Sequence, residues 1–538
     1  MVRLLLLYFF SMVFFPSNLN GQNSPFSNGK WVKIAVTKQG MYQLTGTQLK
    51  AMGFSLPFPS SQAQLFNYNL FNLNDKVSAN PLTGVVENSI QVNDGGDNQF
   101  DEKDFLLFYS EGPIQWKYEE TTALPVHYKN ASADSIFYFI TTQGSNGKRI
   151  LPVAKINTAQ QSTDVFDDRW LIEKDSVSLL NSGKLLLGTP MGQGTGKQAQ
   201  LNYTFSMEGV VLSSPLKIIS QFAATAYQSK ANFNLFINTN LARTSSIDPV
   251  SGFLYQESAN LFKDNFSYTL NANTSLTSPV NLAIAFSSDN TTATGWIDFI
   301  EINARRKIGF WGTNAFGFRN FSIAINGRPT QYQLQHIDTT TMVWDVTHPE
   351  TPLLMPLNFQ SSNTGNFIQT ADTLREFFAL QQASFETPVF VANLQNQNLV
   401  GTTVPDYIFI AAGNFLNAAK KLSSFHATAH GLKGQVYQVN EIFNEFSGGQ
   451  PSATGIRNFI QYLFNQATLK NQAAPKYLLL MGMANYSYKN YNSANQIPVF
   501  ESAASTGILT SYPADDYYTI LNEGDDINVP NALRNIAS

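Results

Sequence analysis

The spacing of apolar residues divides the chain into two parts that meet near residue 400. Before that point, short runs rich in β-branched and aromatic residues alternate with Gly, Asn, Ser and Asp clusters, as in antiparallel β-sandwiches. The clearest runs read FLLFYSEG, SIFYFITT, LKIISQFAATAY, FNLFINTN, VNLAIAFSS and GWIDFIEINARRKI. They recur with no fixed period, so the pattern does not indicate a repeat array. We therefore predict a long β-rich region with sandwich-like, antiparallel sheets.

Beyond Pro405 the pattern changes to strands that alternate with helices. DYIFIAA, GQVYQV and KYLLLMG are short apolar runs typical of buried strands, and residues 452–467 show helical spacing between the last two. Right-handed crossovers make the strands of such a βαβαβ unit parallel, and ligands gather beyond their carboxyl ends. Gly431 stands where a helix C-cap belongs. The helix before it is predicted from five apolar positions: Phe415, Ala418, Leu422, Phe425 and Ala429.

One of these carboxyl ends lies at Gly482, within PKYLLLMGMANYSYKN. The strand opens there into a polar loop, but its tip, Met483 and Asn485, offers no carboxylate, imidazole or thiol. Asp515 and Asp516 follow in SYPADDYYTIL. Paired carboxylates near a sheet edge can orient a histidine or recognise a basic side chain. The alternative is an ordinary turn before a strand.

Composition and charge narrow the class of protein. Of 538 residues, 43% are hydrophobic and 13% are charged, and the net charge of −4 provides no basic field for nucleic acid. The apolar run from Leu4 to Phe15, after Arg3, predicts a signal peptide over residues 1–21 and an exported protein. There is no cysteine, which excludes disulfides and any cysteine nucleophile within these 538 residues.

The chain is too long for one compact core, so several domains are expected. We predict an N-terminal β domain over residues 28–115 and a sandwich-like β region over residues 116–392. A polar linker over residues 393–405 then leads to an α/β domain over residues 406–538.

The loop NDGGDNQFDEKD suggests a calcium site. Its carboxylates, on a flexible glycine-containing loop, are ligands that calcium favours, although the spacing is not that of an EF-hand. The alternative is a solvated hairpin turn. No other cofactor is expected. The candidate ligands are Asp94, Asp97, Asp101 and Asp104.

The five histidines give weaker signals. His426 and His430 stand four apart on the predicted helix, which suits zinc, but no third ligand is evident and a cation is also favoured at a helix C-terminus. A hydrolase that uses His127, His336 or His348 stays open, although no G-x-S-x-G motif nominates a serine.

Several blocks of the chain resemble the gingipain-like cysteine peptidases, and in particular the sortases of the type IX secretion system of Bacteroidetes. The most specific are NEFSGGQPSATGIRNF and PKYLLLMG in the α/β part. In the β region WVKIAVTKQGMYQLT, DNQFDEKDFLLFYSEGP, GWIDFIEINARR, VWDVTHPETP and NQNLVG agree. The resemblance spans nearly the whole chain after the signal peptide.

The resemblance implies a caspase-like α/β/α domain behind a β-rich region, and a Cys–His dyad. In that chemistry a thiolate attacks a peptide carbonyl of secreted cargo that bears a C-terminal sorting signal, and the histidine transfers protons. The acyl group passes to water or to an amine of anionic lipopolysaccharide. The resemblance also implies a location on the outer face of the outer membrane, with a β-barrel shuttle protein as partner.

Three expectations follow from comparing this sequence with the family pattern. The dyad is expected on strands beyond Ser538, so the chain is predicted to be an N-terminal fragment without cysteine-dependent activity of its own. Gly482, Asp515 and Asp516 match positions at the edge of the family's active site, whereas Met483 stands where relatives carry an aspartate. The alternative is a non-catalytic, surface-attached scaffold or binding protein on the same folds.

Overall fold

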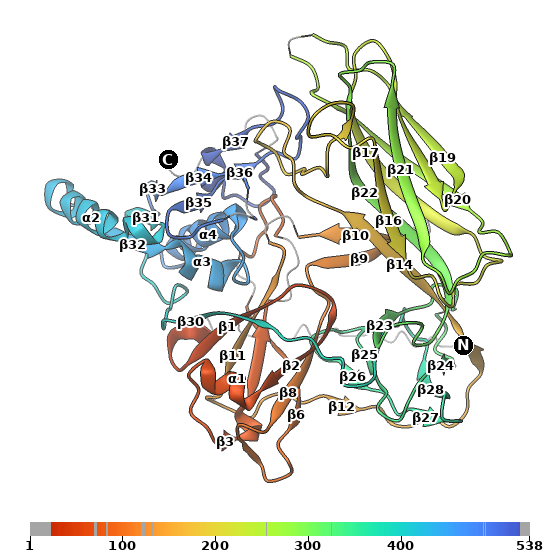
Figure 1. Cartoon of the computed structure of the whole chain (residues 1–538). Coiled ribbons are helices and arrows are strands. Elements are labelled where there is room, and N and C mark those ends of the chain that lie inside the picture. The colour runs from red at the N-terminus through yellow and green to blue at the C-terminus, as the bar shows by residue number, and fades with distance from the viewer. Residues whose placement is uncertain are drawn as a thin grey trace, which may run out of the picture.

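The computed structural model of the chain contains β-rich bodies and one α/β domain, which Figure 1 shows around a central β-hairpin. The α/β domain carries the C-terminal part of the chain. The predicted fold class, antiparallel sheets followed by a parallel sheet with helices, is confirmed. The predicted signal peptide lies outside the described residues. These are residues 23–68, 73–81, 84–119, 124–130, 133–253, 255–323, 325–487, 489 and 491–527.

The N-terminal β domain joins strands that are far apart in the sequence. One sheet has the order β30-β1-β11-β4-β5, and a second has the order β2-β8-β6. Their apolar faces share one core, which includes Ile34, Leu44 and Ile140. The boundary predicted at residue 115 does not coincide with a break in the fold, because β11 and β30 both pair with β1. The strands are β1 (Trp31–Val36), β2 (Gly40–Thr45), β4 (Gln64–Asn67), β5 (Val86–Asn88), β6 (Gln91–Asn93), β8 (Phe105–Ser110), β11 (Ile136–Thr141) and β30 (Val389–Leu394).

A large β-sandwich of two antiparallel sheets follows. The sheet orders are β14-β22-β17-β20 and β16-β21-β18-β19. Alternate residues of each strand face the opposite sheet, and the rings of Phe222 and Phe233 stack across the gap with centroids 4.4 Å apart. The strands are β14 (Val165–Glu173), β16 (Gln200–Phe205), β17 (Leu216–Thr225), β18 (Ala231–Ile237), β19 (Asn240–Ile247), β20 (Asn260–Tyr268), β21 (Val280–Ser288) and β22 (Thr294–Lys307).

A second, smaller sandwich carries an aromatic core. Its sheets have the orders β12-β26-β25-β29-β23 and β13-β24-β28-β27. Phe318, Tyr332 and Phe377 pack against one another in this core. The strands are β12 (Leu151–Pro152), β13 (Gln161–Thr163), β23 (Ala315–Phe318), β24 (Pro329–Gln335), β25 (Met342–Asp345), β26 (Leu353–Leu354), β27 (Asn358–Phe359), β28 (Thr364–Thr370) and β29 (Phe377–Leu380).

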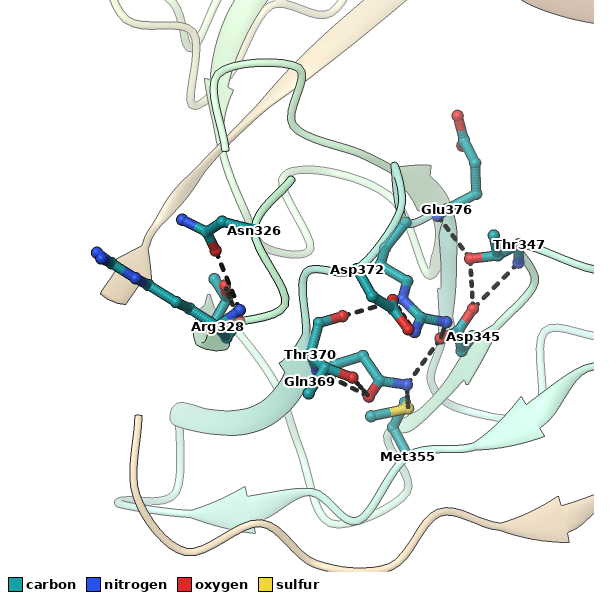
Figure 2. A network of polar contacts seen from close by, with 11 residues as sticks. Asn326, Arg328, Asp345, Thr347, Met355, Gln369, Thr370, Asp372 and Glu376 are labelled. Carbon is teal, nitrogen blue, oxygen red and sulfur yellow. Dashed lines mark hydrogen bonds and ion pairs between the residues drawn. The ribbon is translucent and has the colours of Figure 1, made fainter. Parts of the chain in front are cut away.

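The block VWDVTHPETP has a structural role in this sandwich, shown in Figure 2. The carboxylate of Asp345, which is 3% exposed, accepts hydrogen bonds from Thr347 Oγ1 at 2.6 Å and Gln369 Nε2 at 2.9 Å. Arg375 Nη1 lies 3.1 Å from the same carboxylate. A buried charge is tolerated when it is paired and hydrogen-bonded in this way. The family-like block therefore orders a turn between strands.

A β-hairpin, β9 (Ile114–Glu119) and β10 (Leu124–Lys129), crosses the outer face of the large sandwich. In Figure 1 it lies between the α/β domain and β14. The guanidinium of Arg169 on β14 lies 4.6 Å from the Trp116 ring, and His127 forms ion pairs with Glu173 and Glu301. Through these polar contacts the hairpin covers the side of the sheet β14-β22-β17-β20 that faces away from the sandwich core.

The α/β domain has three layers. The parallel sheet has the order β32-β31-β33. Phe409 and Ala411 of β31 pack against α2, while Ile408 and Ile410 pack against α3 and α4 on the other face. The elements are β31 (Tyr407–Ala411), α2 (Leu416–His430), β32 (Gly434–Gln438), α3 (Val439–Phe446), α4 (Ala453–Leu469) and β33 (Tyr477–Met481).

The helices of this domain differ from the prediction in two respects. The buried side of α2 carries Ala419 and Ser423, whereas Phe425 is 56% exposed, so the predicted apolar face is rotated. Helix α3 was not predicted, although its apolar residues recur at helical spacing in VNEIFNEF. The cap at Gly431 is confirmed, with a left-handed φ of 67°.

The predicted linker packs against α3. Glu445 is 2% exposed, and its Oε1 accepts hydrogen bonds from Gln397 Nε2 at 2.7 Å and from the Leu399 backbone N–H at 3.1 Å. Burial raises the pKa of this carboxyl group. Residues 397–400 are thereby held to the α/β domain, although the sequence there is polar.

Glu445→Ala is expected to lower the free energy of unfolding by about 1–3 kcal/mol, because buried donors lose their acceptor. The loss should be local, so limited proteolysis should cut residues 395–404 sooner than in the unmodified chain. The matched control is Glu350→Ala, at a partly exposed position with no role in this segment. Unchanged cleavage of the segment would contradict this interpretation.

Candidate functional site

The candidate site is the carboxyl edge of the parallel sheet. The ends of β31 and β33 are joined there, since the Ala412 N–H donates to the Met481 carbonyl at 3.0 Å. Beyond Gly482, β34 (Met483–Asn485) pairs with β35 (Gln496–Pro498). A Cβ at Gly482 would lie 2.9 Å from Ile497 Cγ1 and 3.3 Å from Ala412 Cβ. Glycine is therefore required where these strands converge.

Amide side chains line this edge. Asn414 Nδ2 donates to Asn495 Oδ1 at 2.7 Å, and Asn485 Nδ2 donates to Gln496 Oε1 at 2.9 Å. Met483 is 55% exposed beside them. Amides bind and orient, but they supply neither a nucleophile nor a general base at neutral pH. Sequence reasoning missed Asn414 and Asn495; the available signal was the cluster of asparagines after the third strand.

Asp515 and Asp516 begin a short 3-10 helix, η5 (Asp515–Thr519), beside the buried rings of Tyr517 and Tyr518. Partial burial, with a smaller contribution from the charge of Asp516, raises the pKa of Asp515. A carboxyl group with a raised pKa is suited to proton exchange or to recognition of a cation. The role predicted for this pair at the edge of an active site stays a prediction.

A buried carboxylate holds the segment before Asp515 against the β-rich region. Strand β36 (Phe500–Glu501) pairs with β37 (Pro513–Ala514), which leads into η5. Glu501 is 1% exposed, and its Oε2 accepts hydrogen bonds from Ser182 Oγ at 2.8 Å and the Gly183 N–H at 2.9 Å. No local pattern predicts this contact, because it joins residues more than 300 positions apart.

The histidine pair lies at the opposite end of the sheet. The His426 ring packs 5.2 Å from the ring of Tyr407, at the start of β31, and 5.3 Å from that of His430. Helix α2 runs back along the sheet and so places both histidines at the amino ends of the strands. Neither lies at the candidate site, as expected from the family pattern.

The acidic loop packs against the first helix, α1 (Gly46–Ala51). Asp94 Oδ2 accepts a hydrogen bond from Ser60 Oγ at 2.5 Å, and this bond is the main reason why the pKa of Asp94 is lowered. Asp97 and Asp101 accept from backbone N–H groups of their own turns, and Asp104 accepts from that of Asp101. Within the described residues no three His, Cys, Asp or Glu side chains are grouped as metal ligands. Structural calcium stays a prediction.

The most specific family-like block, NEFSGGQPSATGIRNF, lies at the contact between domains. Lys33 Nζ on β1 donates to the Gly449 carbonyl at 2.6 Å, and Asn130 Nδ2 donates to Gln450 Oε1 at 2.7 Å. Gly448 and Gly449 have left-handed φ values of 62° and 84°, which favour glycine. The block therefore fixes the α/β domain to the β region and does not line the candidate site.

Gly482→Ala is expected to lower the free energy of unfolding by about 1–3 kcal/mol, because the added methyl group overpacks the junction of β31 and β35. Met483→Asp, the neighbouring change toward the family pattern, is expected to alter stability by less than about 0.5 kcal/mol, since Met483 is mostly exposed. Urea denaturation of both variants tests this contrast. Equal effects would contradict the geometry described for Gly482.

Comparison with known proteins places the candidate site within a peptidase-like region. Residues 401–532, which include the parallel sheet, match the model of peptidase family C25. The fold of the whole chain is similar to the crystal structure of dimeric latent PorU from Porphyromonas gingivalis, with a TM-score of 0.78 and 22% identity. That match covers 96% of this chain and 48% of the PorU chain, so the chain spans about half of its length. The predicted family resemblance is confirmed at the level of fold.

Two further solved structures are much less similar to this chain. The insecticidal delta-endotoxin Cry8Ea1 from Bacillus thuringiensis has 11% identity over 52% of this chain and 54% of its own, with a TM-score of 0.17. The CBM22 tandem domain of Paenibacillus barcinonensis Xyn10C has 12% identity over 52% of this chain and 79% of its own, with a TM-score of 0.18. No curated protein sequence matches the chain.

Proposed function

We propose that the chain is the scaffold and first half of the catalytic domain of a type IX secretion sortase. The observation that carries this proposal is the carboxyl edge at Gly482, within the C25-like region and inside a fold similar to PorU over nearly the whole chain. Hydrogen bonds between amide side chains order the sheet edge, but its described residues supply no nucleophile. The expected His and Cys would come from the part of the fold that these 538 residues do not span.

In the proposed reaction the cysteine thiolate attacks the carbonyl carbon of the peptide bond before a C-terminal sorting signal. The histidine donates a proton to the leaving amine, and a thioester forms. Water or an amine of anionic lipopolysaccharide then attacks the thioester carbonyl, takes the acyl group and releases the thiolate. Asp515 and Asp516 would orient the histidine or a basic group of the cargo. The proposed place of action is the outer face of the outer membrane, beside a β-barrel shuttle protein. None of the helices in the described part of the chain is long and apolar enough for a membrane crossing.

The experiment compares these 538 residues with the coding sequence extended downstream. A cargo peptide with its sorting signal is incubated with each protein, and cleavage is followed by mass spectrometry. The extended protein should cleave, and a Cys→Ala change in the extension should abolish cleavage, while the shorter chain should show none. Cleavage by the shorter chain, or an extension without cysteine, would overturn the proposal.

A second candidate is a non-catalytic scaffold or binding protein on the same fold. Met483 favours it, since an exposed methionine stands where relatives carry an aspartate at the sheet edge. In the experiment above, an extended protein that binds the cargo peptide without cleaving it would support this candidate.

A further inference from the structure

A cavity lies where the hairpin β9–β10 meets the outer face of the large sandwich. It has a volume of about 440 Å³, within the range of small-ligand sites. Tyr118 and Leu124 of the hairpin form one wall, and residues of β14, β17 and β22 form the floor. Phe321 and Ser322, from the segment after β23, close one side. The cavity is remote in sequence from the residues at Gly482 and belongs to the β-rich region.

An unpartnered amide marks the floor of this cavity. Asn303 lines it and is 6% exposed, yet neither its Oδ1 nor its Nδ2 has a hydrogen-bond partner. Leaving a buried polar group unpaired costs free energy, so native proteins rarely do so without a reason. An amide both donates and accepts, and Ser214 and Ser322, which also line the cavity, add two hydroxyl groups with the same capacity. This set suits a ligand with several hydroxyl groups.

Cations stand beside this amide. Lys217 on β17 is the direct neighbour of Asn303 across the sheet, and within the described residues it forms no ion pair. Arg305 lines the cavity two residues further along β22 and pairs with Asp167 at 2.8 Å, which leaves further guanidinium N–H groups for a ligand. Arg169 is the neighbour of Asn303 on the other side. An anionic group in the cavity would meet more positive than negative charge.

An aromatic wall completes the cavity. The rings of Tyr118 and Phe321 lie with their centroids 4.8 Å apart and their planes 31° apart, and both line the cavity. Tyr118 remains 45% exposed, so its ring has surface left for a ligand. A ring with one largely apolar face gains burial against such a wall, while its polar substituents reach the floor.

We propose that this cavity binds a hydroxylated six-membered ring that bears an oxyanion, that is, a sugar phosphate or a sugar acid. The oxyanion lies against Lys217 and Arg305, the ring hydroxyl groups bond to Asn303 and the two serines, and the ring packs on Tyr118. The inference does not depend on the proposed peptidase function, since it uses no residue of the α/β domain.

The test is isothermal titration calorimetry on the full chain with glucose 6-phosphate, glucuronate, glucose and inorganic phosphate. Glucose 6-phosphate, glucuronate or both should bind. Glucose, which lacks the oxyanion, and inorganic phosphate, which lacks the sugar ring, should each bind at least about tenfold more weakly than the tighter-binding of the first two probes. The relative affinities of the first two probes distinguish a sugar phosphate from a sugar acid. Failure of both to bind below about 10 mM would overturn the proposal.

Lys217→Ala should lower the affinity for the tighter-binding probe by about tenfold or more. The control is Lys263→Ala, which replaces an exposed lysine on the neighbouring strand β20 outside the cavity and should change this affinity less than about twofold. Asn303→Leu should abolish binding and raise the melting temperature of the free protein, because it removes an unpaired buried amide at similar volume. Equal losses for both lysine variants would show general charge attraction and would overturn the proposal. Unchanged binding of the probe by the Asn303→Leu variant would also overturn the proposal.

Discussion

Replacing His127 with alanine is expected to lower the free energy of unfolding of the large sandwich by about 3–5 kcal/mol. The His127 side chain is 8% exposed and lies between two carboxylates, with Nδ1 2.5 Å from Glu301 Oε1 and Nε2 3.2 Å from Glu173 Oε2. Glu301 is fully buried. Without the imidazole, Glu301 would lose the cation that compensates its burial, and Glu173 would keep only its ion pair with Lys129 at 3.6 Å. Urea denaturation followed by tryptophan fluorescence measures the effect, because Trp116 packs against the His127 ring.

The same site predicts a dependence of stability on pH. Burial alone would lower the pKa of His127, but hydrogen bonds to Glu173 and Glu301 raise it to about 9. A histidine whose pKa is raised by folding stabilises the folded state fully below its ordinary pKa of about 6.5, and this contribution is lost as the pH rises to about 9. The expected loss is about 2–3 kcal/mol over that window. Asp298, whose pKa burial and the charges of Glu173 and Asp175 raise to about 7, lowers stability mainly between its ordinary pKa and pH 6.5. It adds less than about 1 kcal/mol to the decline within the window.

Two variants control this prediction. His127→Gln should remove most of the decline between pH 6.5 and 9, since glutamine does not titrate, and leave only the smaller part that Asp298 contributes. His348→Ala replaces an exposed histidine and should change stability by less than about 0.5 kcal/mol at either pH. A chain whose stability is flat across the window would show that His127 is neutral in the folded state. A full set of ion pairs at His127 also argues against its use as the base of a hydrolase in the β region.

The pattern of apolar residues predicted helices and strands correctly where the signal lies within one short stretch of the sequence. The strands at DYIFIAA, GQVYQV and KYLLLMG and the cap at Gly431 are found where expected, because period and capping are local properties of the chain. The buried face of α2 was not predictable in this way. Only one side of that helix meets the sheet, and the small residues Ala419 and Ser423 allow close approach, while Phe425 remains exposed.

The candidate site was harder to predict than the fold. The requirement for glycine at position 482 depends on Ile497 and Ala412, which converge only after the chain has folded. The family-like blocks have different roles. NEFSGGQPSATGIRNF makes contacts between domains, where Gly449 accepts from Lys33, and VWDVTHPETP orders a turn of the small sandwich through Asp345. PKYLLLMG forms β33, which ends at the candidate site but carries no reacting group. The sequence similarity to the family therefore lies in residues that hold the fold together and not in reacting groups. The nucleophile of the proposed reaction has no counterpart in these 538 residues, which contain no cysteine.

Replacing Arg457 with alanine is expected to lower the free energy of unfolding of the α/β domain by about 3–5 kcal/mol. Arg457 on α4 is 1% exposed, and its guanidinium donates to the backbone carbonyls of Asp75 and, at 3.2 Å, Asn74. It also lies 4.8 Å from the ring of Tyr517, which follows the Asp515–Asp516 pair. Arg457 therefore joins residues 73–81 of the N-terminal β domain to η5. Its loss removes a buried donor from the carbonyl groups of Asn74 and Asp75, of which, among the described residues, only the second keeps another donor, the Tyr517 hydroxyl at 3.4 Å.

Hydrogen–deuterium exchange is the measurement that separates this role from general destabilisation. Arg457→Ala should increase exchange in residues 73–81 and in η5 before it affects the large sandwich, because only the first two contact the guanidinium. Arg457→Lys should restore less than half of the protection, since an ammonium group cannot span both carbonyls and the tyrosine ring as a planar guanidinium does. Arg328→Ala, at an exposed position, is the matched control and should leave exchange unchanged. If Arg457→Ala left residues 73–81 as protected as before, the contact between these residues and η5 would not depend on Arg457.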